Sequence, residues 1–269
     1  MRWLWMSLLV AACGGAAASG TASAPATASA TASVTASASA TATASDLQSR
    51  HKQAYAEATA AAGRGDMDAA IRALSRIADE VQDRDDEPLA YWIHNELTWL
   101  HWAKGDNPGA LAETMKGKAA LDRSKLPADK VRSMRLHQLW DAAYLLLEIA
   151  LAKPASQRAA AMAAADAAHS EYEALGRAAD DRNGMAVLWT FFYLRKGDVM
   201  HAAMTTDRVD VAHDDDVQDL YVLAATHQRV GDTEKADELR KRICGADTYL
   251  MKPLIVAQLA REGHPCPAP

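Results

Sequence analysis

The sequence predicts an all-α protein: an α-solenoid of about five antiparallel helical hairpins with a capping helix at its C-terminal end. Three observations lead to this fold class. The chain is rich in Ala, together with Leu, Glu, Arg and Asp, and this composition favours closely packed helices. Runs of β-branched residues are scarce after position 46, so almost no sheet is expected. A short pattern containing Gly-Asp also recurs between apolar segments.

The recurring pattern is an apolar run, a Gly-Asp pair and an Ala four residues after the Asp. It occurs at Gly65-Asp66, Gly105-Asp106, Gly197-Asp198 and Gly231-Asp232, with the alanines at Ala70, Ala110, Ala202 and Ala236. Glycine adopts positive φ at little cost and can end a helix, and the Asp side chain can cap the first amides of the next one. The Ala lies one turn inside the second helix, where a small side chain lets two helices cross closely. Each copy therefore predicts a helix–turn–helix hairpin.

This pattern resembles the tetratricopeptide repeat family. Gly197 and Gly231 lie 34 residues apart, which is the length of one such repeat. The matched positions are the Gly-Asp pair of the turn and the small Ala of the second helix, while the family's Trp-x-x-Leu-Gly pattern in the first helix is not clearly present. The resemblance implies a degenerate solenoid from about residue 46 to residue 263. Unrelated helical-hairpin solenoids can produce the same pattern.

The first two hairpins are predicted from apolar spacing and turn residues. Small residues form one face of a helix over 47–62, and residues 66–81 carry apolar side chains at the i, i+3, i+4, i+7 spacing of a helix. Pro88 suits the first turn of a helix over 89–104, which is apolar on more than one face because neighbours cover both of its sides. Its partner is predicted over 110–121.

The remaining helices follow from the same reasoning. The longest is predicted over 130–152, and Lys153-Pro154 separates it from an Ala-rich helix over 156–179. This third hairpin lacks the Gly-Asp pair, so its turn must be built differently. The later predicted helices are 181–196 with 199–209, 214–230 with 233–244, and a capping helix over 252–261.

The first residues predict export and a lipid anchor. Arg2 precedes a short apolar run, as in a secretory signal peptide over residues 1–12, and the run is too short to span a membrane. Val10-Ala11-Ala12-Cys13 resembles a bacterial lipobox, which implies cleavage before Cys13 and lipidation of that residue. An ordinary signal peptide cut nearby is the alternative. Gly14, in place of the Asp that often marks inner-membrane retention, favours by resemblance the periplasmic face of the outer membrane or the cell surface.

Residues 13–45 are expected to be the lipidated Cys and a disordered tether, followed by a helical repeat domain over 46–269. The tether is almost only Ala, Thr and Ser, so nothing offsets the entropy of ordering it. The whole chain has 29 Lys and Arg against 35 Asp and Glu, a formal net charge of −6. This acidic balance argues against nucleic-acid binding and leaves the lipid anchor as the only expected membrane contact.

The cysteines suggest one cross-link. If Cys13 is lipidated, Cys244 and Cys266 remain as an even pair. In an oxidising compartment they can form a disulfide that joins the Pro-rich tail to the last hairpin. Two unpaired thiols are the alternative.

Five aromatic residues are candidates for binding a partner in a concave groove: Tyr91, Trp99, Trp102, Trp140 and Tyr144. Tyr and Trp often anchor protein interfaces. Packing within and between the repeats is the alternative role for all five, because the first helix of each repeat is covered on two sides.

His213-Asp214-Asp215-Asp216 is the densest cluster of residues that could bind a metal. Its spacing matches no calcium loop or zinc signature, and a helix N-cap followed by an acidic first turn is the alternative. The sequence contains no nucleophile, phosphate-binding or redox motif, so no catalytic residue, metal ligand or cofactor is assigned.

Together these features predict a non-catalytic cell-envelope lipoprotein that serves as a protein–protein interaction scaffold and binds a peptide or helix of another envelope protein. The resemblance implies an assembly factor or a pilot protein, which is the role of tetratricopeptide lipoproteins. The alternatives are a metal-dependent binder or enzyme at the His213 cluster, and a purely structural spacer.

Overall fold

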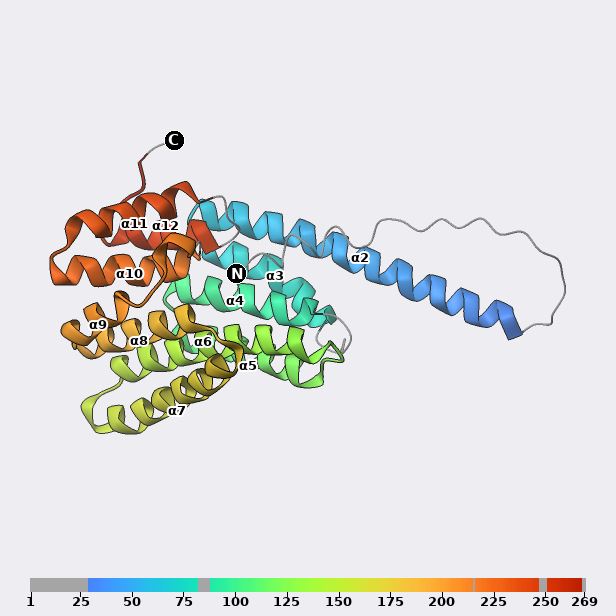
Figure 1. Ribbon diagram of the computed structural model, residues 1–269. Helices are drawn as coiled ribbons and strands as arrows, with labels where there is room; N and C mark the ends of the chain where they lie inside the picture. The colour runs from blue at the N-terminus through green and yellow to red at the C-terminus, as the bar shows by residue number, and fades with distance from the viewer. Residues whose placement is uncertain (1–28, 82–87, 215, 247–250, 268–269) are drawn as a thin grey trace.

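The computed structural model describes residues 29–81, 88–214, 216–246 and 251–267. Within these ranges every regular element is a helix and no strand occurs. Eleven α-helices are described, and they pack as neighbouring pairs into a helical solenoid (Figure 1). The predicted all-α class is therefore confirmed.

Ten of these helices form five hairpins. The pairs are α2 (Ser29–Gly63) with α3 (Met67–Val81), α4 (Leu89–Lys104) with α5 (Asn107–Arg123), α6 (Ala128–Ala152) with α7 (Ala155–Ala179), α8 (Arg182–Lys196) with α9 (Val199–Thr206), and α10 (Val217–Val230) with α11 (Thr233–Gly245). A short 3-10 helix, η1 (Val211–His213), precedes α10, and α12 (Met251–Arg261) follows the fifth hairpin. Apart from the start of α2, the helix ends lie within three residues of the predicted ones.

Four turns between paired helices share one geometry. Their glycines, Gly65, Gly105, Gly197 and Gly231, have φ between 79° and 86°. An L-residue with a Cβ would be strained in this left-handed conformation. The carboxylate of the Asp that follows each glycine accepts a hydrogen bond, at 3.0–3.2 Å, from the backbone N–H three residues further on. Each Gly-Asp pair therefore ends one helix and caps the next.

Small residues occupy the space between the helices beyond each of these turns. The four pattern alanines, Ala70, Ala110, Ala202 and Ala236, are all 0% exposed. The residue seven positions before each turn glycine is also small and buried, namely Ala58, Thr98, Thr190 and Ala224. The hydroxyl of Thr98 lies 3.2 Å from that of Thr114 on the partner helix, and the same contact recurs in the fourth hairpin. The paired helices can therefore approach closely.

The connection between α7 and α8 replaces the glycine with an aspartate. Asp180 has φ 55°, which Asp tolerates better than most residues, and Asp181 accepts a hydrogen bond from the Gly184 N–H at 3.2 Å. The Tyr172 hydroxyl donates to the other oxygen of Asp181 at 2.6 Å. An Asp-Asp pair thus builds this turn, whereas Pro154 alone marks the turn between α6 and α7.

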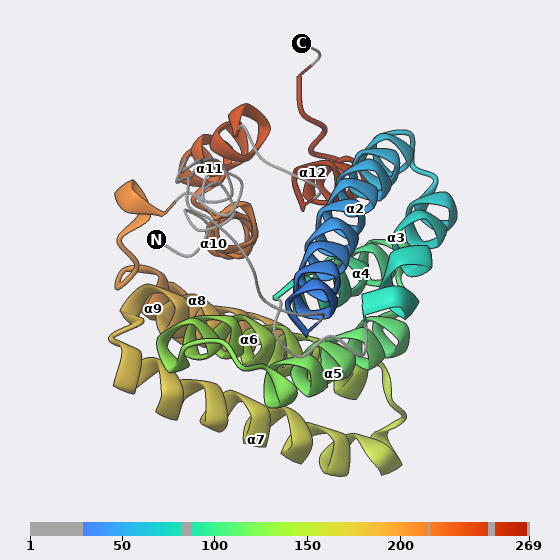
Figure 2. The same cartoon turned by 90° about the vertical axis from the view of Figure 1, so that its right-hand side faces the viewer.

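The sequence suggests that α12 only caps one end of the core. The structure gives it further contacts. It packs against α10 and α11, and also against α2 and α4 near the other end of the solenoid. The helices therefore form a nearly closed ring, with α7 on its outer side (Figure 2). The ring arises because the superhelical path of five hairpins brings the two ends of the array together.

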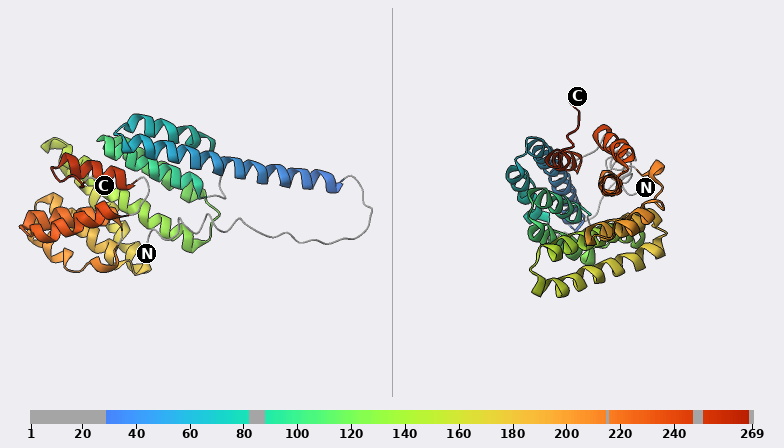
Figure 3. Two further views of the ribbon diagram at one scale, coloured as in Figure 1. Left: turned by 90° about the horizontal axis from the view of Figure 1, so that it is seen from above. Right: turned by 90° about the vertical axis from the view of Figure 1, so that its left-hand side faces the viewer.

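Helix α2 differs from the prediction at its beginning. It starts at Ser29, within the stretch 13–45 that the sequence predicts to be a disordered tether. This part projects beyond the packed helices (Figures 1 and 3). Asp46 is exposed and Leu47 is buried, so the packed part of α2 includes residues from Leu47 onwards. The predicted signal peptide and Cys13 lie outside the described residues.

A larger side chain at Ala110 should destabilise the second hairpin. Ala110 is fully buried, whereas Ala112 on the same helix is exposed. We expect Ala110→Leu to lower the free energy of unfolding by about 1–3 kcal/mol through overpacking. The matched variant Ala112→Leu should change it by less than about 0.5 kcal/mol. Urea denaturation followed by circular dichroism measures both, and equal effects would contradict the close approach of α4 and α5.

His169 on α7 should make stability depend on pH. Its ring centroid lies 4.1 Å from that of Trp189, and burial lowers its pKa from 6.5 to about 4. The unfolded chain therefore binds a proton near pH 6.5 that the folded chain does not bind until about pH 4. The contribution to stability is complete above pH 6.5 and falls by up to roughly 3 kcal/mol as the pH decreases to 4.

The variant His169→Phe keeps an aromatic ring and removes this titration. The difference in unfolding free energy between wild type and variant should shift in favour of the variant between pH 7.5 and pH 4.5. Urea denaturation at several pH values in this range provides the test. A difference that stays constant with pH would show that His169 titrates normally.

Candidate functional site

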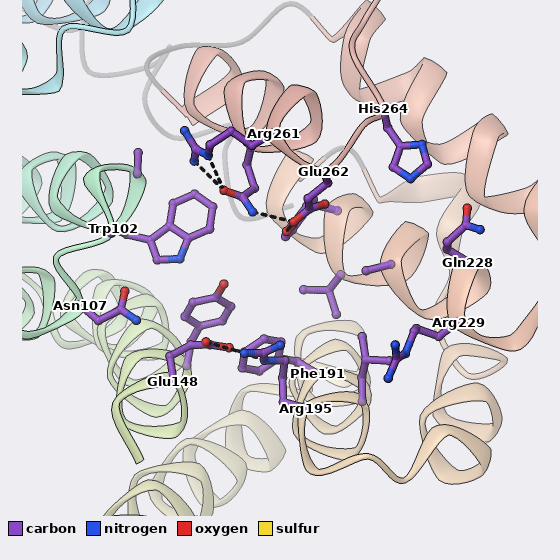
Figure 4. Close-up of a pocket in the computed structure, with 18 of the residues that line it drawn as sticks. Trp102, Asn107, Glu148, Phe191, Arg195, Gln228, Arg229, Arg261, Glu262 and His264 are labelled. Carbon is purple, nitrogen blue, oxygen red and sulfur yellow. Dashed lines mark hydrogen bonds and ion pairs between the residues drawn. The ribbon is translucent and has the colours of Figure 1, made fainter. Parts of the chain in front are cut away.

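A pocket of about 750 Å³ lies where the C-terminal ends of α4, α6, α8 and α10 meet α11 and α12 (Figure 4). These helices line the inside of the ring in Figure 2. The volume is within the range of small-molecule and peptide pockets. The pocket is therefore the candidate functional site among the described residues.

The repeat register explains which side chains reach the pocket. In three hairpins, the residues three and two positions before the turn glycine line it: Trp102 and Ala103, Leu194 and Arg195, and Gln228 and Arg229. Two adjacent positions of the repeat thus place residues at the same cavity in three of the five hairpins. Helix α6 has no turn glycine and contributes Tyr144 and Glu148.

Aromatic rings form the apolar part of the pocket. The Tyr144 ring stacks on Phe191, with centroids 4.2 Å apart, and on Trp140 at 5.4 Å. Trp102 meets Tyr144 edge-on at 6.2 Å and Trp99 at 5.4 Å. Burial, aided by the nearby Glu148 carboxylate, raises the pKa of the Tyr144 hydroxyl well above 10. The hydroxyl therefore stays protonated and can donate a hydrogen bond.

An ion pair joins α6 to α8 at one wall of the pocket. The Arg195 Nε lies 2.5 Å from Glu148 Oε1, and Arg195 also donates to Oε2 at 2.8 Å. Burial lowers the pKa of Arg195, but the hydrogen bond and the charge of Glu148 outweigh it and leave the pKa raised. The bidentate contact fixes the guanidinium plane at this wall.

The segment at the end of α12 forms the opposite wall (Figure 4). The Tyr221 hydroxyl of α10 donates to Glu262 at 2.5 Å, and the Gln258 amide donates to the same oxygen at 2.6 Å. Arg261 donates to Gln258 Oε1 at 2.5 Å. Burial, together with Glu262, raises the pKa of Tyr221 above its usual range. These contacts connect α12 to α10 across one edge of the pocket.

Arg240 of α11 is a buried cation at the pocket. Its residue is 9% exposed, and it donates to Gln228 at 3.1 Å and to Asp237 at 2.9 Å. Its Nε atom is buried without a hydrogen-bond partner. A buried guanidinium N–H without an acceptor is costly, so this atom lowers the stability of the fold.

A disulfide joins Cys244, near the end of α11, to Cys266 beyond α12. The Cα atoms are 5.6 Å apart, a usual separation for such a bridge. The bridge closes a segment that includes Arg261, Glu262 and His264, all of which line the pocket. It therefore restrains one wall of the pocket in addition to the tail.

The five predicted partner-binding residues lie in two different environments, the pocket and the core. Trp102 and Tyr144 line the pocket. Tyr91, Trp99, Trp140 and Tyr144 are 1–5% exposed and belong to the core, so their assignment as contacts for a partner is wrong for this structure and only Trp102 is partly open. The reason is that α4 and α6 have neighbours on both sides, which leaves only the ends of their inner faces open.

The acidic cluster before α10 is built as a helix cap. Asp216 Oδ1 accepts from the Gln218 N–H at 2.9 Å, and Asp214 Oδ1 accepts from the Asp216 N–H at 3.1 Å. Asp215 and the side chain of His213 lie outside the described part of the chain. Among the residues that are described, no group of three or more His, Cys, Asp or Glu could hold a metal ion.

Arg195, Arg229 and Arg261 line the pocket but are not among the predicted site residues. The first two could be found from the register, because they lie two positions before a turn glycine, as Ala103 does. Arg261 could not, since its place at the pocket depends on how α12 crosses the ring.

Within the described ranges, no helix combines the length and the apolar character that crossing a membrane requires. No protein-family model matches the chain, and neither a curated protein nor a solved structure shows significant similarity to it.

Removal of the disulfide should loosen α12 in particular. In the chain-entropy model, a bridge between residues separated by 22 positions stabilises by about 3 kcal/mol. We expect the double variant Cys244→Ser and Cys266→Ser to reduce hydrogen-exchange protection of residues 254–261 by on the order of a hundredfold. The amides of α4 and α5 serve as the internal control and should keep their protection. Unchanged protection of α12 would mean that its contacts alone hold it in place.

Proposed function

We propose that this protein is a non-catalytic lipoprotein of the cell envelope that binds a short segment of another envelope protein. The observation that carries the proposal is the pocket inside the ring, to which three of the five hairpins contribute residues from the same two register positions. In such a repeat array a continuous inner surface is the usual site for an extended partner.

The size of the pocket favours a short segment over a long helix. A helix with its side chains is about 10–12 Å across, so less than two turns would fill about 750 Å³. Trp102 is partly exposed and offers an apolar surface, and Asn107 and Gln228 offer amide groups that can pair with a peptide backbone. An extended segment or the end of a helix therefore fits best.

The proposed anchor comes from the sequence Val10-Ala11-Ala12-Cys13, which resembles a lipobox. We infer that acyl chains on Cys13 hold the domain at the periplasmic face of the outer membrane or at the cell surface. Anchoring would raise the concentration of the pocket near membrane-bound partners. The Gly-Asp turns and buried alanines support a degenerate tetratricopeptide-like array, and that resemblance favours a role as an assembly or pilot factor.

Site-specific photo-cross-linking tests the proposal. Leu194, at the pocket, is replaced by a benzophenone amino acid in the full-length chain expressed in its host, and exposed Ala164 on the outer helix α7 is replaced in the control. We expect a protease-sensitive adduct from position 194 in the membrane fraction and none from position 164. In a chain that also carries Cys13→Ser, the protein should leave the membrane fraction and the adduct should weaken.

Two results would contradict this function. Equal adducts from both positions would indicate non-specific contact, and no adduct from position 194 would argue against a protein partner in the pocket. Retention of the Cys13→Ser chain in the membrane fraction would refute the anchor without affecting the pocket.

A further inference from the structure

The pocket is positively charged, although the protein is acidic. Five cationic side chains line it against two carboxylates, Glu148 and Glu262, while the whole chain has a formal net charge of −6. The cations are Lys104, Arg195, Arg229, Arg240 and Arg261. A cleft lined mainly by one sign of charge concentrates ligands of the opposite sign.

Three of these cations have a carboxylate partner. Arg195 pairs with Glu148, as described above. Lys104 lies 2.7 Å from Asp68, and Arg240 lies 2.9 Å from Asp237. Neither Asp68 nor Asp237 lines the pocket, so these two carboxylates approach their cations from outside it.

Arg229 and Arg261 have no carboxylate partner among the described residues. Arg261 donates to the neutral Gln258 amide, and Arg229 is exposed at the end of α10. They project from different walls of the pocket, one from α10 and one from α12 (Figure 4). Guanidinium groups on different sides of the pocket suit an extended ligand with more than one negative charge.

Arg240 is a third arginine of the lining, but its side chain is packed into the wall of the pocket. It is nine-tenths buried and donates to Gln228 and Asp237, and its Nε atom is covered by neighbouring protein atoms. Arg229 and Arg261 are exposed at the rim, so they are the guanidinium groups that a ligand can reach.

The rest of the lining limits the chemical class of the ligand. A single inorganic anion would leave most of a pocket of about 750 Å³ empty. The partly exposed Trp102 offers an apolar surface beside the charges. A polypeptide segment with Asp or Glu beside an apolar or aromatic residue matches both.

We propose that the pocket binds a short acidic segment of polypeptide, with its carboxylates between Arg229 and Arg261 and an apolar side chain against Trp102. This inference rests on the proposed peptide-binding function and specifies the charge of the partner. Binding is strongest at low ionic strength, since the two exposed guanidinium groups are screened by salt.

The test is an unbiased peptide selection. A random dodecapeptide phage library is selected on the purified full-length chain with its disulfide intact, and the enriched peptides are synthesised with a fluorophore. We expect an excess of Asp and Glu together with an aromatic or large apolar residue. Fluorescence anisotropy should show binding to the double variant Arg229→Gln and Arg261→Gln that is at least about tenfold weaker than to wild type.

A matched control separates local from global charge. The double variant Arg158→Gln and Arg208→Gln removes the same charge from two exposed arginines outside the pocket and should bind as wild type does. Circular dichroism and melting temperature verify that both variants are folded. Enriched peptides without excess acidic residues, or equal binding by both double variants, would overturn the acidic segment but leave peptide binding intact. Failure to enrich any peptide would overturn both.

Discussion

The close approach of two helices at each chain reversal is the constraint on which this structure depends. A glycine with positive φ allows an abrupt reversal, and the next aspartate begins the returning helix. Buried alanines then allow backbones to lie nearer than larger side chains would permit. Repetition of one geometry sets the first helices of the hairpins side by side, so their C-terminal ends converge on a common cavity.

Local patterns predicted most of the fold because the turn chemistry is local. The four Gly-Asp turns, the helix between Leu89 and Lys104 and the five hairpins all follow from short-range signals in the sequence. The packed part of α2 begins at Leu47, as the sequence predicts, and the tract of Ala, Ser and Thr before it has no packing requirement. The contact of α12 with α2 and α4 could not be read from the sequence, since it depends on the accumulated curvature of the whole array.

The pocket residues were only partly predictable, because their exposure depends on how the helices pack together. Aromatic residues indicated the correct helices, but composition could not separate Trp102, at the pocket, from Trp99 three positions earlier in the core. The position two or three residues before the turn glycine would have made that distinction. Arginine side chains carried no sequence signal of their own, because charged residues near helix C-termini are common on solvated surfaces and favour the helix dipole.

The acidic body and the basic pocket act differently on anionic molecules that approach the protein. The body repels strongly anionic polymers, whose charge is spread over long distances. The pocket attracts a compact anionic group that comes within about a Debye length of Arg229 and Arg261. The protein can therefore distinguish a compact anionic group from a long anionic polymer, because its positive charge is confined to the pocket.

The position of the disulfide links maturation of the site to the environment of the protein. Arg261, Glu262 and His264 lie C-terminal to every other wall of the pocket, so a chain that has not been completed to this point has an open ring. The covalent link across that wall forms only where thiols are oxidised. The cavity therefore gains its final side only after the C-terminal segment has been made and Cys244 and Cys266 have been oxidised.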